Sequence, residues 1–455
     1  MSMDRRDLLK WSGATGAIVA GASSAAAAPT PRMPISALGL DATQMGVRPG
    51  SPVDQSTALQ RAIDRAAAAR VPLALMPGAY RVGDLKLPPG AQLVGIRGAT
   101  RLAMTGGASL VSSTGTDGVT LSGLVLDGRT IPLKDGRGLA HFENARGLRI
   151  FECEIATAGG TAIYLQSSDG EISGNAILDS REAALFSRDG RGLTVARNTI
   201  RGAGNNGIQI WQSAPGDDGA MVLDNRIEDI LNRSGGTGQY GNAISAFRAA
   251  NVIVRGNRIR NCSYTAIRGN AANGIQITGN SITGMGEVAI YSEFGFQGSI
   301  VANNMIEDAA LGISITNFND GGRLAVVSGN IIRNLRDRRP VGNDDGGGVG
   351  IHVEADTAVT GNVVENAPRI GISLGFGWGL RDVTAVGNIV RQSEIGMSVS
   401  VSKGVGSVVI ADNVISGVTR GALIGRNYQD TVTSDLLKGG LERFSHISAS
   451  GNRAS

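Results

Sequence analysis

A short pattern built around asparagine recurs through most of this 455-residue chain and limits the folds it can adopt. The pattern is an apolar residue, two further residues, Asn, any residue and a second apolar residue, as in "VRGNRI" and "ITGNSI". Cys153 stands as a degenerate first member, a frayed last copy surrounds Asn452, and the asparagines between them are Asn175, Asn198, Asn225, Asn257, Asn280, Asn304, Asn330, Asn362, Asn388 and Asn413. Steps of 22 to 32 residues between Cys153 and Asn413 indicate a solenoid, because one coil of this length cannot bury its apolar face alone.

The residues around each asparagine predict short strands and a sharp turn. Asparagine tolerates a positive φ, so it can turn the chain between two strands. Side-chain amides of stacked coils can also bond to one another along the stack. A second strand with period-two alternation follows each turn, as in "AIYLQS", "GIQIWQ" and "GIHVEA". Three short strands in each coil predict an all-β parallel β-helix, in which the asparagines are scaffold.

The N-terminus has the features of an export signal. Arg5 and Arg6 precede Leu8-Leu9-Lys10, a modest apolar stretch and an alanine-rich end near Ala28. This resembles a twin-arginine signal peptide over residues 1–28, and its apolar part is too short for a membrane span. We expect the twin-arginine translocase as a partner during export, a periplasmic or secreted location, and no membrane span in the mature form.

A linker is expected over residues 29–50, followed by a cap helix and first strands over residues 51–110. Asp54, Thr57, Leu59, Gln60 and Ile63 begin the helix, and "VPLALMPGAYRV" reads as a strand followed by Pro-Gly-x-Tyr. This segment resembles the N-terminal end of pectate-lyase-like β-helix proteins, in which a helix caps the open core. The resemblance covers roughly residues 40–455.

With the export signal, the chain is similar to a family of twin-arginine-translocated β-helix repeat proteins. That resemblance implies a single-stranded right-handed parallel β-helix of about a dozen coils, with the repeats over residues 111–455. It implies a fold and no particular reaction.

The outward positions of the second strands form two columns when the strands are aligned on their inward apolar residues. The first column is Tyr164, Phe186, Gln209, Ser245, Arg268, Tyr291, Ser314, His352, Ser373 and Ser398. The second column is Gln166, Arg188, Trp211, Phe247, Asn270, Glu293, Thr316, Glu354, Gly375 and Ser400. Aromatic rings suit sugar rings, and Arg pairs with carboxylates, although aromatics also stack for stability alone. We predict that substrate binds at Gln209, Trp211, Phe247, Asn270 and Thr316.

Two long connections point to one region of these columns. They are "EDILNRSGGTGQYGN" before Ser245 and "RNLRDRRPVGNDDGGG" before His352. About four coils at about 4.8 Å each separate them, a span of about 19 Å. Long loops often carry function, so the sequence predicts that these two wall a groove.

Residues in this region suggest chemistry on an acidic sugar. Lyases and epimerases of uronates need a base, an acid and a cation that neutralises the carboxylate. Tyr291, His352 and Arg268 could fill these roles between them. A hydrolase would instead use two carboxylates, here Glu293 and Glu354, at about the upper limit of separation for an inverting pair.

Other features of the sequence bear on cofactors and ligands. Asn343, Asp344 and Asp345 in a glycine-rich loop could hold calcium, although such loops are more often plain turns. No zinc spacing or nucleotide-binding loop is present, and a net charge of +4 is too weak to indicate nucleic acid. Cys153 and Cys262 lie on different coils, so no disulfide between them is expected.

Two functions of different classes follow. The preferred one is binding or modification of an extracytoplasmic acidic polysaccharide, with lyase or epimerase chemistry ahead of hydrolysis. The alternative is a non-catalytic envelope scaffold or glycan-binding module.

Overall fold

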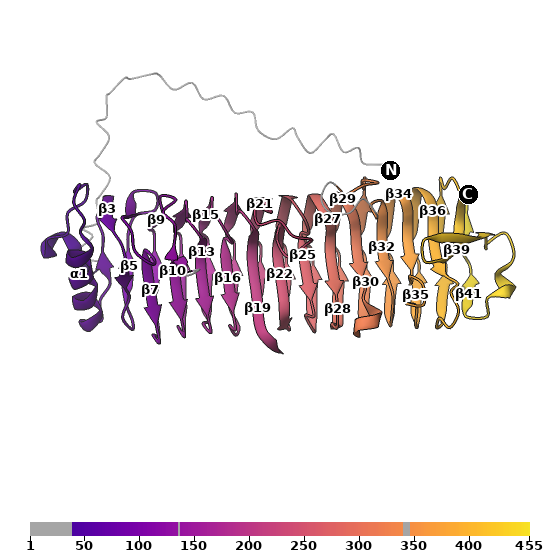
Figure 1. Cartoon of the computed structure of the whole chain (residues 1–455), viewed down its shortest axis with the longest axis horizontal. Coiled ribbons are helices and arrows are strands. Elements are labelled where there is room, and N and C mark those ends of the chain that lie inside the picture. Colours follow the sequence, from indigo (N-terminus) through magenta and orange to yellow (C-terminus); the bar gives the residue numbers. More distant parts are fainter. Residues whose placement is uncertain (1–38, 135–136, 340–345) are drawn as a thin grey trace, which may run out of the picture.

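The described residues form a right-handed parallel β-helix of about 14 turns with one α-helix. A computed structural model describes residues 39–134, 137–339 and 346–455. Figure 1 shows the coils stacked along the long axis, with α1 at one end and the β39–β40 region at the other. The predicted fold class is therefore confirmed.

The strands that precede each Asn turn form one 16-stranded sheet, which we call the back face. They are β1 (Leu40–Asp41), β2 (Leu73–Ala74), β5 (Gln92–Val94), β8 (Thr120–Ser122), β11 (Leu148–Phe151), β14 (Gly170–Ser173), β17 (Thr194–Ala196), β20 (Met221–Leu223), β23 (Ile253–Arg255), β26 (Ile275–Thr278), β28 (Gln297–Ala302), β30 (Arg323–Ser328), β33 (Thr357–Thr360), β35 (Val383–Val386), β37 (Val408–Ala411) and β41 (Ile447–Ser450).

The strands that follow each Asn turn form a second surface, which we call the side face. They are β3 (Gly78–Val82), β6 (Thr100–Met104), β9 (Val125–Asp127), β12 (Glu154–Ala156), β15 (Ala176–Leu178), β18 (Thr199–Arg201), β21 (Arg226–Ile230), β24 (Arg258–Cys262), β27 (Ser281–Glu293), β29 (Met305–Ile315), β31 (Ile331–Arg333), β34 (Val363–Leu374), β36 (Ile389–Ser400), β38 (Val414–Ser416) and β42 (Arg453–Ala454).

The third surface, the groove face, carries the two predicted columns. Its strands are β4 (Leu85–Lys86), β7 (Val111–Thr114), β10 (Gly138–Glu143), β13 (Thr161–Gln166), β16 (Leu185–Arg188), β19 (Asn206–Asp217), β22 (Asn242–Ala250), β25 (Ile267–Asn270), β32 (Val349–Val353), β39 (Gly421–Asn427) and the second halves of β27, β29, β34 and β36. Because those four strands run around the corner, the side and groove faces join in one 26-stranded sheet.

Each end of the solenoid carries an element that does not belong to the repeat. At the N-terminal end, α1 (Ser56–Ala68) buries Leu59, Ala62, Ile63 and Ala66 and contacts the first strands, which agrees with the expected cap. At the C-terminal end, β40 (Asp430–Asp435) folds back antiparallel on β39. Short 3₁₀ helices in the described connections include η3 (Ala42–Met45), η5 (Phe318–Asp320) and η6 (Leu441–Arg443).

The repeated asparagines form one continuous ladder inside the corner between the back and side faces. In each step an Asn Nδ2 donates to the Oδ1 of the next Asn, as from Asn257 to Asn280 at 3.0 Å. The same Oδ1 accepts the backbone N–H of Asn257 at 2.9 Å. The ladder runs from Asn175 to Asn452, and the N–H of Cys153 donates to Asn175. Its inner asparagines are 0–1% exposed, which confirms that they are scaffold.

The residue that takes the turn is not the ladder asparagine. Positive φ falls one position earlier, for example at Gly256 (69°), Gly279 (66°) and Asn303 (57°). The ladder residue keeps ordinary backbone angles because its amide must point into the core to bond with both neighbouring coils. The expected turn is present, but the reason given for asparagine at that position was wrong.

The remaining features of the core agree with one narrow, continuous interior. Cys153 and Cys262 are buried free thiols, and Cys262 is in register with Ile230 and Met285 of the adjacent coils. Within residues 39–134, 137–339 and 346–455, no helix is long and apolar enough to cross a bilayer.

Candidate functional site

Strand register on the groove face confirms the predicted columns. The first column is in register from Tyr164 to Ser398 through every coil. The second is in register from Gln166 to Glu293. Thr316 and Glu354, however, lie just past the ends of β29 and β32, so both are turn residues rather than strand residues.

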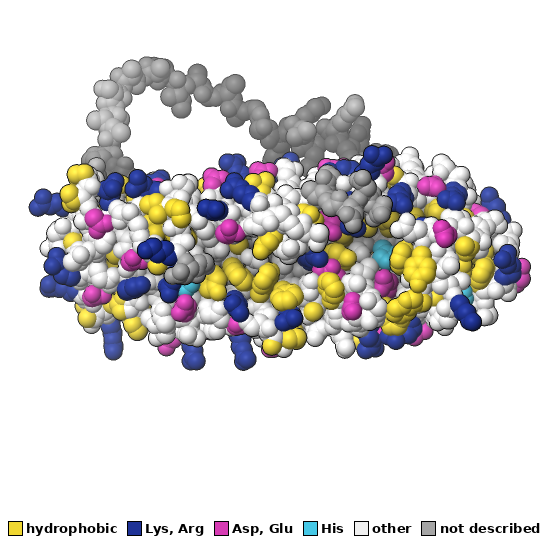
Figure 2. Space-filling view, in the orientation of Figure 1, with side chains coloured by type: hydrophobic (Ala, Val, Ile, Leu, Met, Phe, Trp, Pro, Cys, Tyr) yellow, Lys and Arg dark blue, Asp and Glu magenta, His cyan; other side chains and the backbone are white. Residues whose placement is uncertain are grey.

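Five rings form an unbroken line along the N-terminal half of the groove face. Successive ring centroids lie 4.9 Å apart from His141 to Tyr164, 5.4 Å to Phe186, 5.1 Å to Trp211 and 5.3 Å to Phe247. Figure 2 shows hydrophobic side chains gathered along the middle of the molecule, over the strands that Figure 1 labels β16 to β22. Such stacking stabilises the sheet and also exposes a ribbon of ring surface.

Members of the line differ in how far solvent reaches them. Trp211 and Phe247 are half-buried, so a ligand can reach their rings. Gln209 is only 5% exposed and lies beneath its neighbours. His141 is 4% exposed, and its Nε2 lies 2.8 Å from Glu143, while its Nδ1 accepts the Gly138 N–H. Burial lowers the pKa of His141, so it serves as a neutral ring at the end of the line.

An ion-pair cluster continues the groove face beyond Phe247. Arg268 Nε donates to Glu293 Oε1 at 2.6 Å, and Asn270 Nδ2 donates to the same oxygen at 2.9 Å. The side chains of Arg268 and Glu293 are 13% and 3% exposed. The guanidinium lies 5.4 Å from the centroid of the Tyr291 ring. Arg268, Asn270, Tyr291 and Glu293 are therefore brought together, but the positive charge of Arg268 is already paired within the protein.

Both long loops reach this cluster, the first directly and the second through Glu287, a residue the sequence did not indicate. The backbone oxygen of Gly238, from the first loop, accepts a bond from Arg268 Nη1. Arg339, from the second loop, lies 3.4 Å from Glu287, which is itself 4.0 Å from Arg268. Glu287 sits where the register of β27 shifts, between Met285 and Val288. Strict alternation of inward and outward residues therefore could not place Glu287. The extra residues in "TGMGEVAI" are the feature of the sequence that marks this shift of register.

The electrostatics of the cluster are set by burial and by its two carboxylates. Burial alone would lower the pKa of Arg268, but Glu293 and Glu287 outweigh it and raise that pKa above the usual value. Burial raises the pKa of Tyr291, and the Glu293 carboxylate adds to the effect. Tyr291 therefore keeps its proton at neutral pH and is suited to donate it rather than to act as a base.

His352 and Glu354 form a second cluster, separated from Tyr291 by the coil of Ser314. His352 Nε2 lies 3.6 Å from Glu354 Oε1, and its Nδ1 lies 3.2 Å from the Ser373 hydroxyl. Glu354 Oε2 also accepts the Phe318 N–H at 2.7 Å. Each of these two side chains keeps about 15% of its surface exposed, so the imidazole is oriented from two sides and can still meet a ligand.

Exposed aromatic residues flank this second cluster, and the sequence analysis missed them. Phe318 lies 5.7 Å from Trp378 between ring centroids, and Phe376 lies 5.3 Å from Tyr428. Trp378, Tyr428 and Phe376 are 50%, 48% and 42% exposed. They stand in the connections that follow groove strands, where no repeat pattern fixes position, so alignment of the strands could not reveal them.

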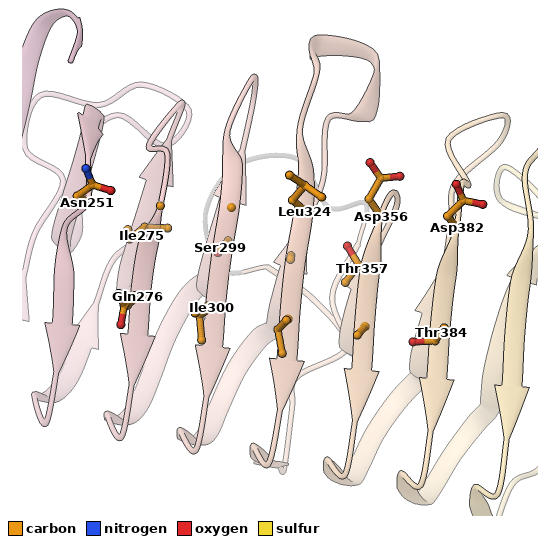
Figure 3. Close-up of a pocket in the computed structure, with 15 residues that line it drawn as sticks. Asn251, Ile275, Gln276, Ser299, Ile300, Leu324, Asp356, Thr357, Asp382 and Thr384 are labelled. Atoms are coloured by element: carbon orange, nitrogen blue, oxygen red, sulfur yellow. The ribbon is translucent and has the colours of Figure 1, made fainter. Parts of the chain in front are cut away.

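A hollow of about 650 Å³ lies on the back face, away from these clusters. Figure 3 shows Ile300 and Leu324 on adjacent strands, with Asp356 and Asp382 beside them. Asp356 is already held by Arg323 at 2.7 Å and by Arg381 at 2.7 Å. The floor of the hollow offers apolar surface and no free acid–base pair, so we place the candidate site on the groove face.

Two predicted features fall outside the described residues. They are Arg5 and Arg6 of the signal and Asn343, Asp344 and Asp345 of the possible calcium loop. In the part of the chain that the structure describes, no three His, Cys, Asp or Glu side chains cluster as metal ligands would.

Comparison with known proteins now identifies the family. Residues 103–227 and 215–390 match the family described as a right-handed β-helix region, and together they make up more than half of the chain. The chain belongs to the right-handed β-helix family. A search of curated proteins finds no sequence that matches it.

Solved β-helix structures resemble the chain in fold. An N-terminal fragment of bacteriophage phi29 gene product 12 has a TM-score of 0.57 at 15% identity, covering 92% of this chain and 71% of that one. The pre-mature gene product 12 has a TM-score of 0.55 at 14% identity, covering 92% of this chain, which spans only 57% of that protein. The periplasmic alginate epimerase AlgG has a TM-score of 0.43 at 12% identity, covering 85% of this chain and 77% of that one. At these identities the likeness to gene product 12 shows a shared fold alone, and that to AlgG is too weak to argue from.

Proposed function

We propose that this β-helix protein binds an acidic polysaccharide along its groove face and acts on it as a lyase or an epimerase. The observation that carries the proposal is the continuous line of rings from His141 to Phe247, which leads into the Arg268 cluster. A polymer of sugar rings that carry carboxylates matches this surface, because the aromatic rings can stack on the sugars and the Arg268 cluster beyond them carries charge.

The proton chemistry is assigned to Tyr291 and His352. Their positions lie two coils apart in one column, about 10 Å, which leaves room for one sugar ring between them. His352, oriented by Glu354, takes the proton from C5 of the uronate. In a lyase, the electrons of that bond form the C4–C5 double bond, the C4–O bond breaks, and Tyr291 protonates the leaving oxygen. In an epimerase, the C4–O bond stays intact and Tyr291 donates a proton to C5 from the opposite side.

Arg268 supports this chemistry at a cost. Its guanidinium already bonds to Glu293, so a substrate carboxylate would have to share it. Hydrolysis by Glu293 and Glu354 is less well supported, because Glu293 is almost fully buried and bonded to both Arg268 and Asn270.

The same pairing favours a second candidate function, a non-catalytic glycan-binding module or envelope scaffold. A cation that is satisfied within the protein stabilises the coil without any ligand, and the ring line would then bind sugar without reaction. The proposal also includes export by the twin-arginine translocase and a periplasmic or secreted location, supported by Arg5-Arg6 and the residues after them.

The experiment incubates the exported form with a panel of uronate polysaccharides. Binding is measured by affinity electrophoresis, and cleavage of the polymer by elimination is measured by the ultraviolet absorbance of the unsaturated product. Epimerisation is measured by exchange of the C5 proton in deuterated water. Trp211→Ala should weaken binding, whereas His352→Gln and Tyr291→Phe should abolish turnover and leave binding in place.

Phe151→Ala is the matched control, because Phe151 is a partly exposed aromatic residue of the back face. Binding with no turnover on any uronate polymer would support the glycan-binding module. Equal binding by wild type and the Trp211→Ala variant would remove the groove face as the site.

A further inference from the structure

An exposed apolar stripe runs along the C-terminal half of the side face. It consists of the residues directly after five successive ladder asparagines, namely Met305, Ile331, Val363, Ile389 and Val414. Met305, Val414, Ile331 and Ile389 are 48%, 45%, 41% and 40% exposed, and Val363 is half-buried. An ordered row of large apolar side chains in water is unusual for a free surface.

The same register position is polar on the four coils that come directly before the stripe. There it holds Thr199, Arg226, Arg258 and Ser281. Both sets of coils belong to the same β-helix and the same asparagine ladder, so the scaffold does not require apolar residues at this position. The stripe is therefore a local property of the last coils.

A column of alternating charges runs beside the stripe, two residues further along each strand. Its members are Glu307, Arg333, Glu365 and Arg391 on four successive coils. Arg333 lies 3.0 Å from Glu307, and Arg391 lies 3.3 Å from Glu365. All four side chains are between 32% and 53% exposed, so each can meet a further partner. With two charges of each sign, the column does not resemble the basic surface that an anionic membrane selects.

We propose that the stripe and the charged column bind a second copy of this chain in an antiparallel, two-fold dimer. A two-fold axis parallel to the strands keeps each column opposite itself and reverses the order of the coils. Glu307 then faces the partner's Arg391, and Arg333 faces the partner's Glu365. The stripe packs against the partner's stripe, with Ile331 opposite the partner's Val363.

The alternative two-fold axis fails on charge. An axis along the solenoid keeps the order of the coils. If the charged columns face each other in that arrangement, each glutamate lies opposite the partner's glutamate and each arginine opposite the partner's arginine. Such like-charge contacts are unfavourable in an interface. The apolar stripe gives the affinity, and the order of the four charges selects the antiparallel arrangement.

Light scattering of the purified full chain tests the dimer. We expect twice the chain mass, and the mass of a single chain for Ile331→Asp. Thr199→Asp is the matched control, since it places the same charge at the same register position of a coil outside the stripe, and it should remain dimeric. A wild-type protein that is monomeric, or an Ile331→Asp variant that stays dimeric, would overturn the proposal.

A charge-swap experiment tests the arrangement itself. Arg333→Glu sets two glutamates opposite each other, and Glu365→Arg sets two arginines opposite each other, so each variant alone should dissociate. Mixed together, they restore both opposite-sign contacts and should form a heterodimer, which shows that each variant is folded. Dissociated variants that do not associate on mixing would exclude the antiparallel arrangement.

Discussion

Removing one inner asparagine of the ladder should cost several kcal/mol without changing any apolar contact. In Asn280→Ala, the backbone N–H and one Nδ2 hydrogen of Asn257 both lose their acceptor. Both groups are buried, because Asn257 is 0% exposed and Asn280 is 1% exposed. A buried donor left without a partner costs about 1–3 kcal/mol, so the two together predict a loss of about 2–6 kcal/mol in the free energy of unfolding.

Asn452→Ala is the matched control at the end of the ladder. Asn452 accepts the same two bonds from Asn413, but it is half-buried, so water can replace it. Urea denaturation should show the larger loss for Asn280→Ala, and hydrogen exchange should be fastest relative to wild type at the Asn257 amide. Equal losses in the two variants, or a loss below about 1 kcal/mol for Asn280→Ala, would refute the reasoning.

Three further predictions concern buried ionisable groups. Arg268→Ala should destabilise the fold by about 3–5 kcal/mol, because it leaves Glu293 buried without its charged partner. Arg197→Ala breaks an exposed pair with Glu171 and should cost less than about 1 kcal/mol. Equal shifts in the urea midpoint would contradict this. Burial raises the pKa of Asp218 from 3.8 to about 6, so the folded state keeps this proton to a higher pH than the unfolded state does. The free energy of unfolding should therefore fall by about 3 kcal/mol as pH rises from 3.8 to about 6. Asp218→Asn should flatten that dependence, and an unchanged pH profile would count against it. Burial raises the pKa of Cys153 to about 11 and also raises the pKa of Cys262. Mass spectrometry should therefore find neither thiol alkylated in the native protein and both alkylated after denaturation without reductant. Rapid alkylation of the native protein would show that these coils open.

Periodic positions could be predicted from the sequence, and irregular ones could not. Period-two alternation correctly predicted that Arg268 lies beside Tyr291 on the adjacent coil. The register is well defined because a shift of one residue would expose the apolar side chains of the strand to water. It could not show that Glu287 also lies beside Arg268, since Glu287 stands at a shift of register in β27. Trp378 and Tyr428 also lie in connections that no repeat governs. The proposed roles of the groove residues stay predictions.

The elements at the two ends of the solenoid have a consequence for how the protein behaves at high concentration. A parallel sheet exposes a row of unpaired N–H and C=O groups at each terminal coil, and such a row can template another chain. Here α1 covers the first coil, and antiparallel β40 occupies the outer edge of β39 on the groove face, so neither of these two edges is left open for end-to-end polymerisation. Opening the C-terminal hairpin would turn a particle of fixed length into a seed for filaments, even though every internal coil remained intact.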